Sequence, residues 1–150
     1  MIGGPPGLFP SEIRLAGYRE ALEEADIPFD TTLIAEGDFM RPGGARAMHL
    51  LMERQVRPTA IFCANDLMAI GAMDVARELG MTIPRDVAIV GYDDIEAASL
   101  VAPALTTVLN PAYDMGKTAG QLLLQRIQGT YEGPGRRVVV PHRLIRRESA

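Results

Sequence analysis

The chain has 150 residues, of which 47% are hydrophobic and 23% charged, with a formal net charge of −4. This composition excludes a disordered chain and is typical of a globular domain long enough to bury a core. No apolar run reaches about 18 residues, so a membrane-spanning helix is not expected. The acidic balance argues against nucleic-acid binding by this chain alone, because DNA-binding modules usually carry a basic face.

Strand and helix signals alternate along the whole chain. Ser11, Asn65 and Asp94 are candidate helix N-caps, and Pro42 and Pro111 are typical of first helical turns. The expected elements, in order, are a strand at 1–2, a helix at 11–25, a strand at 31–36, a helix at 42–54, a strand at 59–63, a helix at 65–79, a strand at 87–90, a short helix at 95–99, a strand at 105–109, a helix at 111–128, and strands at 137–140 and 143–145.

This alternation predicts an α/β fold with a doubly wound parallel sheet flanked by helices. Ligands of such sheets bind at the carboxyl ends of the strands. Three loops fit that place: those after Ile2, Cys63 and Val90. The first loop, residues 3–7, matches neither glycine-rich phosphate pattern, and its two prolines lack N–H donors, so phosphate binding is disfavoured there.

Polar residues in these loops are candidates for ligand binding. Asn65 either caps the following helix or faces a ligand hydroxyl, and both roles are compatible. Asp93 is the ligand candidate, since Asp94 is better placed as a cap. A carboxylate at Asp93 suits sugar hydroxyls or the N–H groups of a base, and Arg14 offers a fork of donors to the same ligand.

Residues that support catalysis or metal binding are few. The single cysteine, Cys63, cannot form an intramolecular disulfide and lies within an apolar strand, where a reactive thiolate is not expected. Zinc-ligand spacing is absent, with only His49 and His142 available, and neither follows a buried strand beside a nucleophile. We therefore expect no enzyme, no metal site and no cofactor, in a protein of a reducing, cytoplasmic compartment without a signal peptide at residues 1–4.

The helix expected over residues 66–79 has almost no polar face. A helix that is apolar all round is buried on several sides. Because a sheet covers only one side, the pattern indicates a partner for the outer side, and a second copy of the chain is the simplest partner.

Several motifs together resemble the LacI/GalR family of transcriptional repressors. Residues 58–72 (PTAIFCANDLMAIGA) and 83–94 (IPRDVAIVGYDD) carry the resemblance, and it continues through the segments RLAGY at 14–18, EGDF at 36–39 and PALTTV at 103–108, with Pro111 and Met115-Gly116. The match runs over essentially the whole chain. The motifs are specific in combination and weak one by one.

The resemblance implies a periplasmic-binding-protein-like sensor that binds a small effector, a sugar or a purine. It implies that residues 1–110 form the C-terminal subdomain, while residues 111–150 are a crossover helix and returning strands, that is, the remnant of a largely missing N-terminal subdomain plus the last strand. Operator DNA would be bound only through a helix-turn-helix that this chain lacks. The ligand-binding positions carried over are Arg14, Asn65 and Asp93, with Phe39 as a stacking wall and Asn110 near the crossover.

The resemblance also implies a homodimer. Its expected surface comprises Phe39, Met40, Arg41, Ala69, Ile70, Met73, Asp74, Ala97, Ala98, Leu100 and Val101. A periplasmic sugar-binding protein of a transport system and an enzyme on the same scaffold remain alternatives, because fold alone does not determine function. The apolar helix and the 105–108 crossover favour the regulator over the solute-binding protein, which is typically a monomer.

Overall fold

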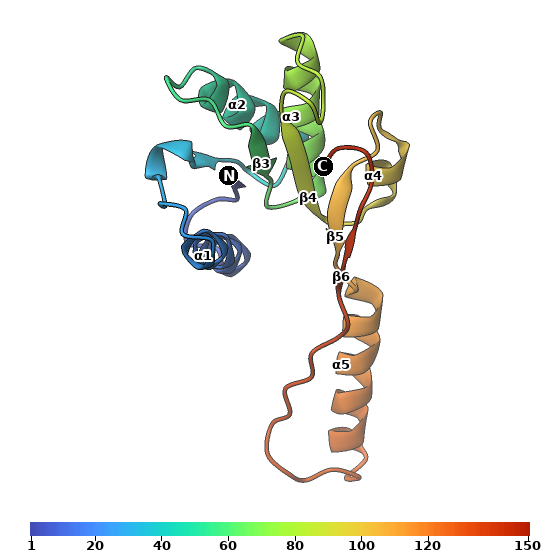
Figure 1. Ribbon diagram of the computed structural model, residues 1–150. Helices are drawn as coiled ribbons and strands as arrows, with labels where there is room; N and C mark the ends of the chain where they lie inside the picture. Colours follow the sequence, from blue (N-terminus) through green and yellow to red (C-terminus); the bar gives the residue numbers. More distant parts are fainter.

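The computed structural model describes residues 1–150, and Figure 1 shows how their elements are arranged. The chain alternates strands and helices as the sequence predicts. The elements are β1 (Ile2–Gly3), α1 (Phe9–Glu24), the 3₁₀ helix η1 (Thr31–Leu33), β2 (Ala35–Glu36), α2 (Arg41–Met52), β3 (Ala60–Phe62), α3 (Asp66–Glu78), β4 (Ala88–Asp93), α4 (Glu96–Leu100), β5 (Thr106–Leu109), α5 (Ala112–Ile127) and β6 (Arg143–Ile145).

The strands form a mostly parallel sheet. β1 pairs with β2, and β3, β4, β5 and β6 follow side by side, with only β6 antiparallel. Ile2 forms a parallel bridge with Cys63, and its carbonyl accepts the Ala64 N–H at 2.8 Å, which joins the two groups of strands. The predicted α/β fold with a parallel sheet flanked by helices is confirmed.

Helices α2 and α3 pack against each other through two glycines. A Cβ atom on Gly44 would lie 2.1 Å from the Met68 carbonyl oxygen, and one on Gly71 would lie 2.0 Å from the Arg41 carbonyl oxygen. Both contacts are with backbone, which has no flexible end that could move aside. The two glycines therefore set the spacing between α2 and α3.

This packing corrects the interpretation of the apolar helix. Ala69, Ile70 and Met73 are 0%, 5% and 1% exposed, and they belong to the 21-residue core cluster with residues of α2 and of the sheet. The apolar character of α3 is thus explained within one chain, because α2 covers the side that the sheet leaves open. These three side chains do not form an exposed surface for a second copy.

Helix α5 projects away from the rest of the molecule, and residues 129–142 run back beside it (Figure 1). None of its residues is buried, and Leu123, Leu124 and Ile127 are large exposed apolar side chains. We call residues 112–142 the arm. The strand predicted at 137–140 is wrong, because this segment lies along the arm, where no sheet edge is available for pairing.

Three local predictions also need correction. Ser11 lies inside α1, whose N-cap is Leu8 without a side-chain hydrogen bond, so Ser11 is not the cap. Asp94 does not cap α4, whose N-cap is Ile95. Residues 31–36 divide into a 3₁₀ turn and the two-residue strand β2, because the Asp30 carboxylate accepts the Thr32 N–H and favours a turn there. No helix is long and apolar enough to cross a membrane.

The last residues of the chain complete the sheet between β4 and β5. The buried Ser149 hydroxyl donates to the Ile89 carbonyl at 2.6 Å and accepts the Thr106 N–H at 2.8 Å. Ser149→Ala should therefore lower the free energy of unfolding by about 1–3 kcal/mol, because it leaves a buried N–H without a partner. Urea denaturation measures this loss. Ser99→Ala, at an exposed site, serves as the control and should change stability by less than about 0.5 kcal/mol.

Candidate ligand-binding site

Arg14 is held in place from two sides. Its Nη1 donates to the Ala64 carbonyl at 2.9 Å, and its Cζ lies 4.0 Å from the centre of the Tyr92 ring. A guanidinium stacked on an aromatic ring keeps a fixed orientation and is held there by a cation–π attraction. The sequence reasoning missed Tyr92, whose position between Gly91 and Asp93 was the available signal.

Asp93 and Asn110 lie beside Arg14. The Asn110 side-chain amide donates to Asp93 Oδ1 at 3.1 Å, and Arg14 Nη2 lies 3.9 Å from the same oxygen. Asp93 ends β4, and Asn110 follows the last residue of β5. Because these parallel strands are neighbours, their carboxyl ends bring Asp93 and Asn110 together at one edge of the sheet, and Arg14 reaches them from α1.

A hollow of about 440 Å³ opens beside this cluster. Arg14 and Asn110 line it together with Tyr92, and the remaining walls come from the start of α1, the start of α5 and the returning segment. The full lining is Phe9, Pro10, Ile13, Arg14, Tyr92, Asn110, Pro111, Met115, Arg137, Val138, Val139, Val140 and His142. A mainly apolar wall with a few convergent polar groups is typical of small-molecule sites.

Asn65 and Phe39 stand next to the cluster without lining the hollow. The Asn65 side chain accepts the Met68 N–H at 3.0 Å and donates to the Phe39 carbonyl at 2.8 Å, so its predicted capping role is confirmed. Phe39 has φ +63°, which is unusual for a bulky residue, and its ring packs on Gly4. The hydrogen bond from Asn65 therefore holds Phe39 in a disfavoured backbone conformation. In this conformation the centre of the Phe39 ring lies 6.0 Å from Arg14 Cζ.

Two further carboxylates, Asp94 and Asp66, lie near Asp93. Arg147 holds Asp94 through an ion pair of 2.7 Å and donates to the Leu105 carbonyl at 2.8 Å. Asp66 is fully buried and accepts hydrogen bonds from Thr107 and from the Ile95 N–H. Neither Asp66 nor Arg147 was singled out from the sequence, since an aspartate after a capping asparagine and a terminal arginine are both common surface features.

Burial raises the pKa of the Asp66 carboxyl above its ordinary value, and repulsion from Asp93 adds to the shift, while the hydrogen bonds oppose it. The folded protein therefore binds this proton more tightly than the unfolded chain does. The stabilisation from protonated Asp66 is complete below the pKa that this carboxyl has in the unfolded chain, near 4. It is lost as the pH rises through the higher pKa that the carboxyl has in the folded protein.

Asp66→Asn should remove this pH dependence. The measured quantity is the unfolding free energy of Asp66→Asn minus that of the original chain. This difference should be larger at pH 8 than at pH 4, because only the original chain must bury a charge at pH 8. Urea unfolding of both proteins across this range gives the difference. A difference that falls as the pH rises would contradict the assignment.

No three His, Cys, Asp or Glu side chains are placed to hold a metal ion. Burial raises the pKa of the Cys63 thiol to about 12, so it is not a thiolate nucleophile at neutral pH.

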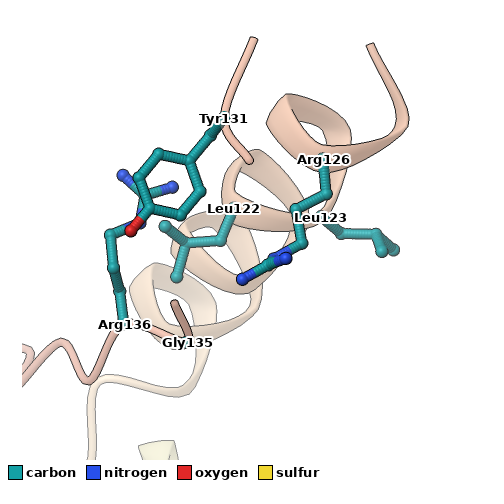
Figure 2. Close-up of a pocket in the computed structure, with 6 residues that line it drawn as sticks. All are labelled: Leu122, Leu123, Arg126, Tyr131, Gly135 and Arg136. Atoms are coloured by element: carbon teal, nitrogen blue, oxygen red, sulfur yellow. The ribbon is translucent and has the colours of Figure 1, made fainter. Parts of the chain in front are cut away.

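A second hollow, of about 250 Å³, lies on the arm (Figure 2). Its lining includes Tyr131, whose ring centre lies 3.9 Å from the Arg136 guanidinium and 5.5 Å from the Arg126 guanidinium. Both arginines also bind the chain itself: Arg126 donates to the Gly133 carbonyl and Arg136 to the Gln125 side chain. No carboxylate or side-chain amide lines this hollow, whereas Arg14 and Asn110 both line the hollow of about 440 Å³, which is therefore the better candidate site.

Comparisons with known proteins agree with the fold. The profile of the periplasmic binding protein-like domain family matches residues 1–150. Over 136 residues the chain is 43% identical to the HTH-type transcriptional repressor PurR of Escherichia coli O1:K1 / APEC, which covers 91% of this chain and 40% of that protein. The chain thus spans about two fifths of the length of this relative.

Solved structures of regulators superpose closely. The structure of the transcriptional regulator CelR in complex with cellobiose superposes on 99% of this chain with a TM-score of 0.93. The match covers 45% of the CelR chain at 41% sequence identity. The Lac repressor bound to ONPG matches 99% of this chain and 44% of its own at 32% identity and a TM-score of 0.89. The chain therefore belongs to the periplasmic binding protein-like domain family, and it resembles the form of that domain found in LacI-type transcriptional regulators.

Proposed function

We propose that this chain is the effector-sensing and dimerisation part of a DNA-binding transcriptional regulator, and that it binds a small sugar or purine-like ligand. The observation that carries the proposal is the convergence of Arg14, Asp93 and Asn110 beside a mainly apolar hollow of about 440 Å³. The similarity to transcriptional repressors adds support and favours a regulator over a periplasmic sugar-binding protein or an enzyme.

The polar cluster suits a neutral ligand with several hydrogen-bonding groups. Asp93 has acceptor oxygens for hydroxyl or ring N–H groups, and Arg14 offers donors in a fixed plane because Tyr92 supports it. One related structure holds cellobiose and another holds ONPG, which supports the sugar class. Phe39, near Arg14, would supply the flat apolar contact that either a sugar ring or a base requires.

We infer two structural units within this chain. Residues 1–110 would form one subdomain, which the last strand, β6, joins by pairing with β5. The rest of residues 111–150, which is mainly the arm, would belong with a second subdomain outside these 150 residues. The exposed apolar side chains of α5, among them Leu123 and Ile127, support this division, because a helix with such a face normally packs against something. The ligand would then be enclosed between the subdomains, and operator DNA would be bound through a helix-turn-helix outside these 150 residues.

Effector binding would act by shifting the angle between two subdomains. A ligand that contacts Arg14 and Asp93 on one side and a second subdomain on the other binds more tightly when the two subdomains are closed around it. The difference in binding free energy between the closed and open states sets how far the ligand shifts the equilibrium toward the closed state. That change would alter the dimer and thereby its operator affinity. A coupling of about 1–3 kcal/mol is normal for such switches.

The dimer surface we propose is smaller than the sequence predicts. Ala69, Ile70, Met73 and Ala98 are buried within the chain and are removed from it. Met40 and Leu100 are 56% and 75% exposed, and Arg41, the residue after Met40, forms an ion pair with Asp74 of α3. The remaining predicted positions are Phe39, Ala97 and Val101.

Leu100→Asp should convert a dimer into a monomer of 16.2 kDa, because a charge placed in an apolar contact loses its hydration. Light scattering coupled to size exclusion measures the mass. Leu79→Asp, at the 49% exposed C-cap of α3 and outside the proposed surface, is the matched control and should leave the dimer intact. A chain that is monomeric before any substitution would contradict the proposed surface.

A thermal-shift panel tests the function itself. We expect a rise in melting temperature with at least one compound among mono- and disaccharides and purine bases, because a ligand that binds only the folded state stabilises it. A response confined to sugars or to purines assigns the class. No response from any compound at millimolar concentration would contradict effector binding by this chain.

A further inference from the structure

One buried carboxylate contacts the loop that presents Asp93, although it does not line the hollow. Asp66, the first residue of α3, accepts the Thr107 hydroxyl at 2.5 Å with Oδ1 and the Ile95 N–H at 3.0 Å with Oδ2. It is 0% exposed, as is Thr107. A single side chain therefore links α3, β5 and the start of α4.

The same carboxylate rests against the backbone of β4. A Cβ atom on Gly91 would lie 2.1 Å from Asp66 Oδ1, so only glycine allows this approach. Gly91 stands two residues before Asp93, in the strand that ends at the cluster. The Asp66 carboxylate thus contacts β4 at Gly91, before the loop that carries Asp93, and binds the Ile95 N–H at the end of that loop.

The loop between these contacts has a disfavoured backbone. Asp93 and Asp94 have φ values of +122° and +56°, in the region that favours glycine. Such a conformation persists only when surrounding contacts determine it. Each of the three residues in the loop is held by a side chain from elsewhere: Asp93 by Asn110, Asp94 by Arg147 and Ile95 by Asp66.

We propose that Asp66 is a positioning residue of the ligand site: its buried carboxylate fixes the Asp93–Ile95 loop, and through it the place of the Asp93 carboxylate relative to Arg14 and Asn110. The proposal rests on the function proposed above. Because Ile95 is also the N-cap of α4, the same contact joins the ligand loop to the helix that carries Leu100. A displacement of Asp93 by a ligand would then be passed to the proposed dimer surface.

The test compares Asp66→Ala with Asp66→Asn in the complete 150-residue chain, without ligand. Amide hydrogen exchange is followed by NMR at Ile95, together with the side-chain NH₂ resonances of Asn110. In Asp66→Ala the Ile95 amide should exchange at least about tenfold faster than global unfolding accounts for, and the Asn110 resonances should shift. Asp66→Asn, which keeps an acceptor oxygen, should restore most of both signals.

Asp86→Ala is the matched control, because Asp86 also accepts a backbone N–H, from Thr82, at a site remote from the loop. It should leave the Ile95 and Asn110 signals unchanged. If Asp66→Ala does not fold, Gly91→Ala replaces it, since the added Cβ displaces the carboxylate. Equal acceleration of all protected amides, or unchanged Ile95 and Asn110 signals, would overturn the proposal. Since no ligand is present, this outcome is separate from failure of the thermal-shift panel.

Discussion

Gly71→Ala should lower the free energy of unfolding by about 3 kcal/mol, although alanine is the better helix former. The new methyl group would lie 2.0 Å from the Arg41 carbonyl oxygen and 2.9 Å from the Ala45 nitrogen. Both atoms belong to the backbone of α2, so α2 and α3 must move apart. That movement opens the largest part of the core, and urea denaturation at neutral pH measures the loss.

The control makes the same substitution in another helix. Gly17 lies within α1, and a Cβ atom there would meet nothing within 4 Å. Gly17→Ala should raise the unfolding free energy by about 0.5–1 kcal/mol, because alanine loses less backbone entropy on folding. Equal effects of the two substitutions would show that helix propensity, and not the contact with α2, determines the outcome at Gly71.

Asp93→Ala should weaken binding of the ligand identified in the panel by about 10- to 100-fold. Hydrogen bonds to charged groups contribute about 1.5–3 kcal/mol, and the substitution also leaves Arg14 and Asn110 without the oxygen that they share. Isothermal titration calorimetry gives the dissociation constant. Asp93→Asn keeps the shape of the side chain and tolerates positive φ, so it separates the loss of charge from distortion of the loop.

Asp114→Ala is a suitable comparison, because it removes a carboxylate from the first turn of α5 without touching the cluster. Its dissociation constant should match that of the original chain within about twofold. If Asp93→Ala binds the ligand as tightly as the original chain, the ligand lies elsewhere and the assignment of the cluster fails.

The order of the elements could be predicted from sequence because it depends on local signals. The strand expected at 59–63 and the Asn65 cap both match the structure. The predicted cap at Ser11 was wrong because α1 begins two residues earlier, at Phe9, so Ser11 lies within the helix. The predicted cap at Asp94 was wrong because this side chain pairs with Arg147, 53 residues away. Sequence spacing alone does not reveal partners at that distance.

The site was predictable in part. The loops after parallel strands pointed to Arg14, Asp93 and Asn110 once the family resemblance was included, and the structure brings these three together. Tyr92 and Asp66 were missed because each acts on another part of the site: Tyr92 stacks on Arg14, and Asp66 binds the loop that carries Asp93. Neither contact can be recognised from sequence spacing. The helix interface was misassigned because the apolar pattern of residues 66–79 does not distinguish a neighbouring helix of the same chain from a second copy.

The most direct test of the central claim is an NMR titration of the 150-residue chain with the compound that raises its melting temperature. A ligand bound at the carboxyl edge of β4 and β5 should shift the resonances of Arg14, Tyr92 and Asn110 and leave the arm around Tyr131 unchanged. Shifts confined to Tyr131 and its two arginines, or shifts at neither place, would contradict the account.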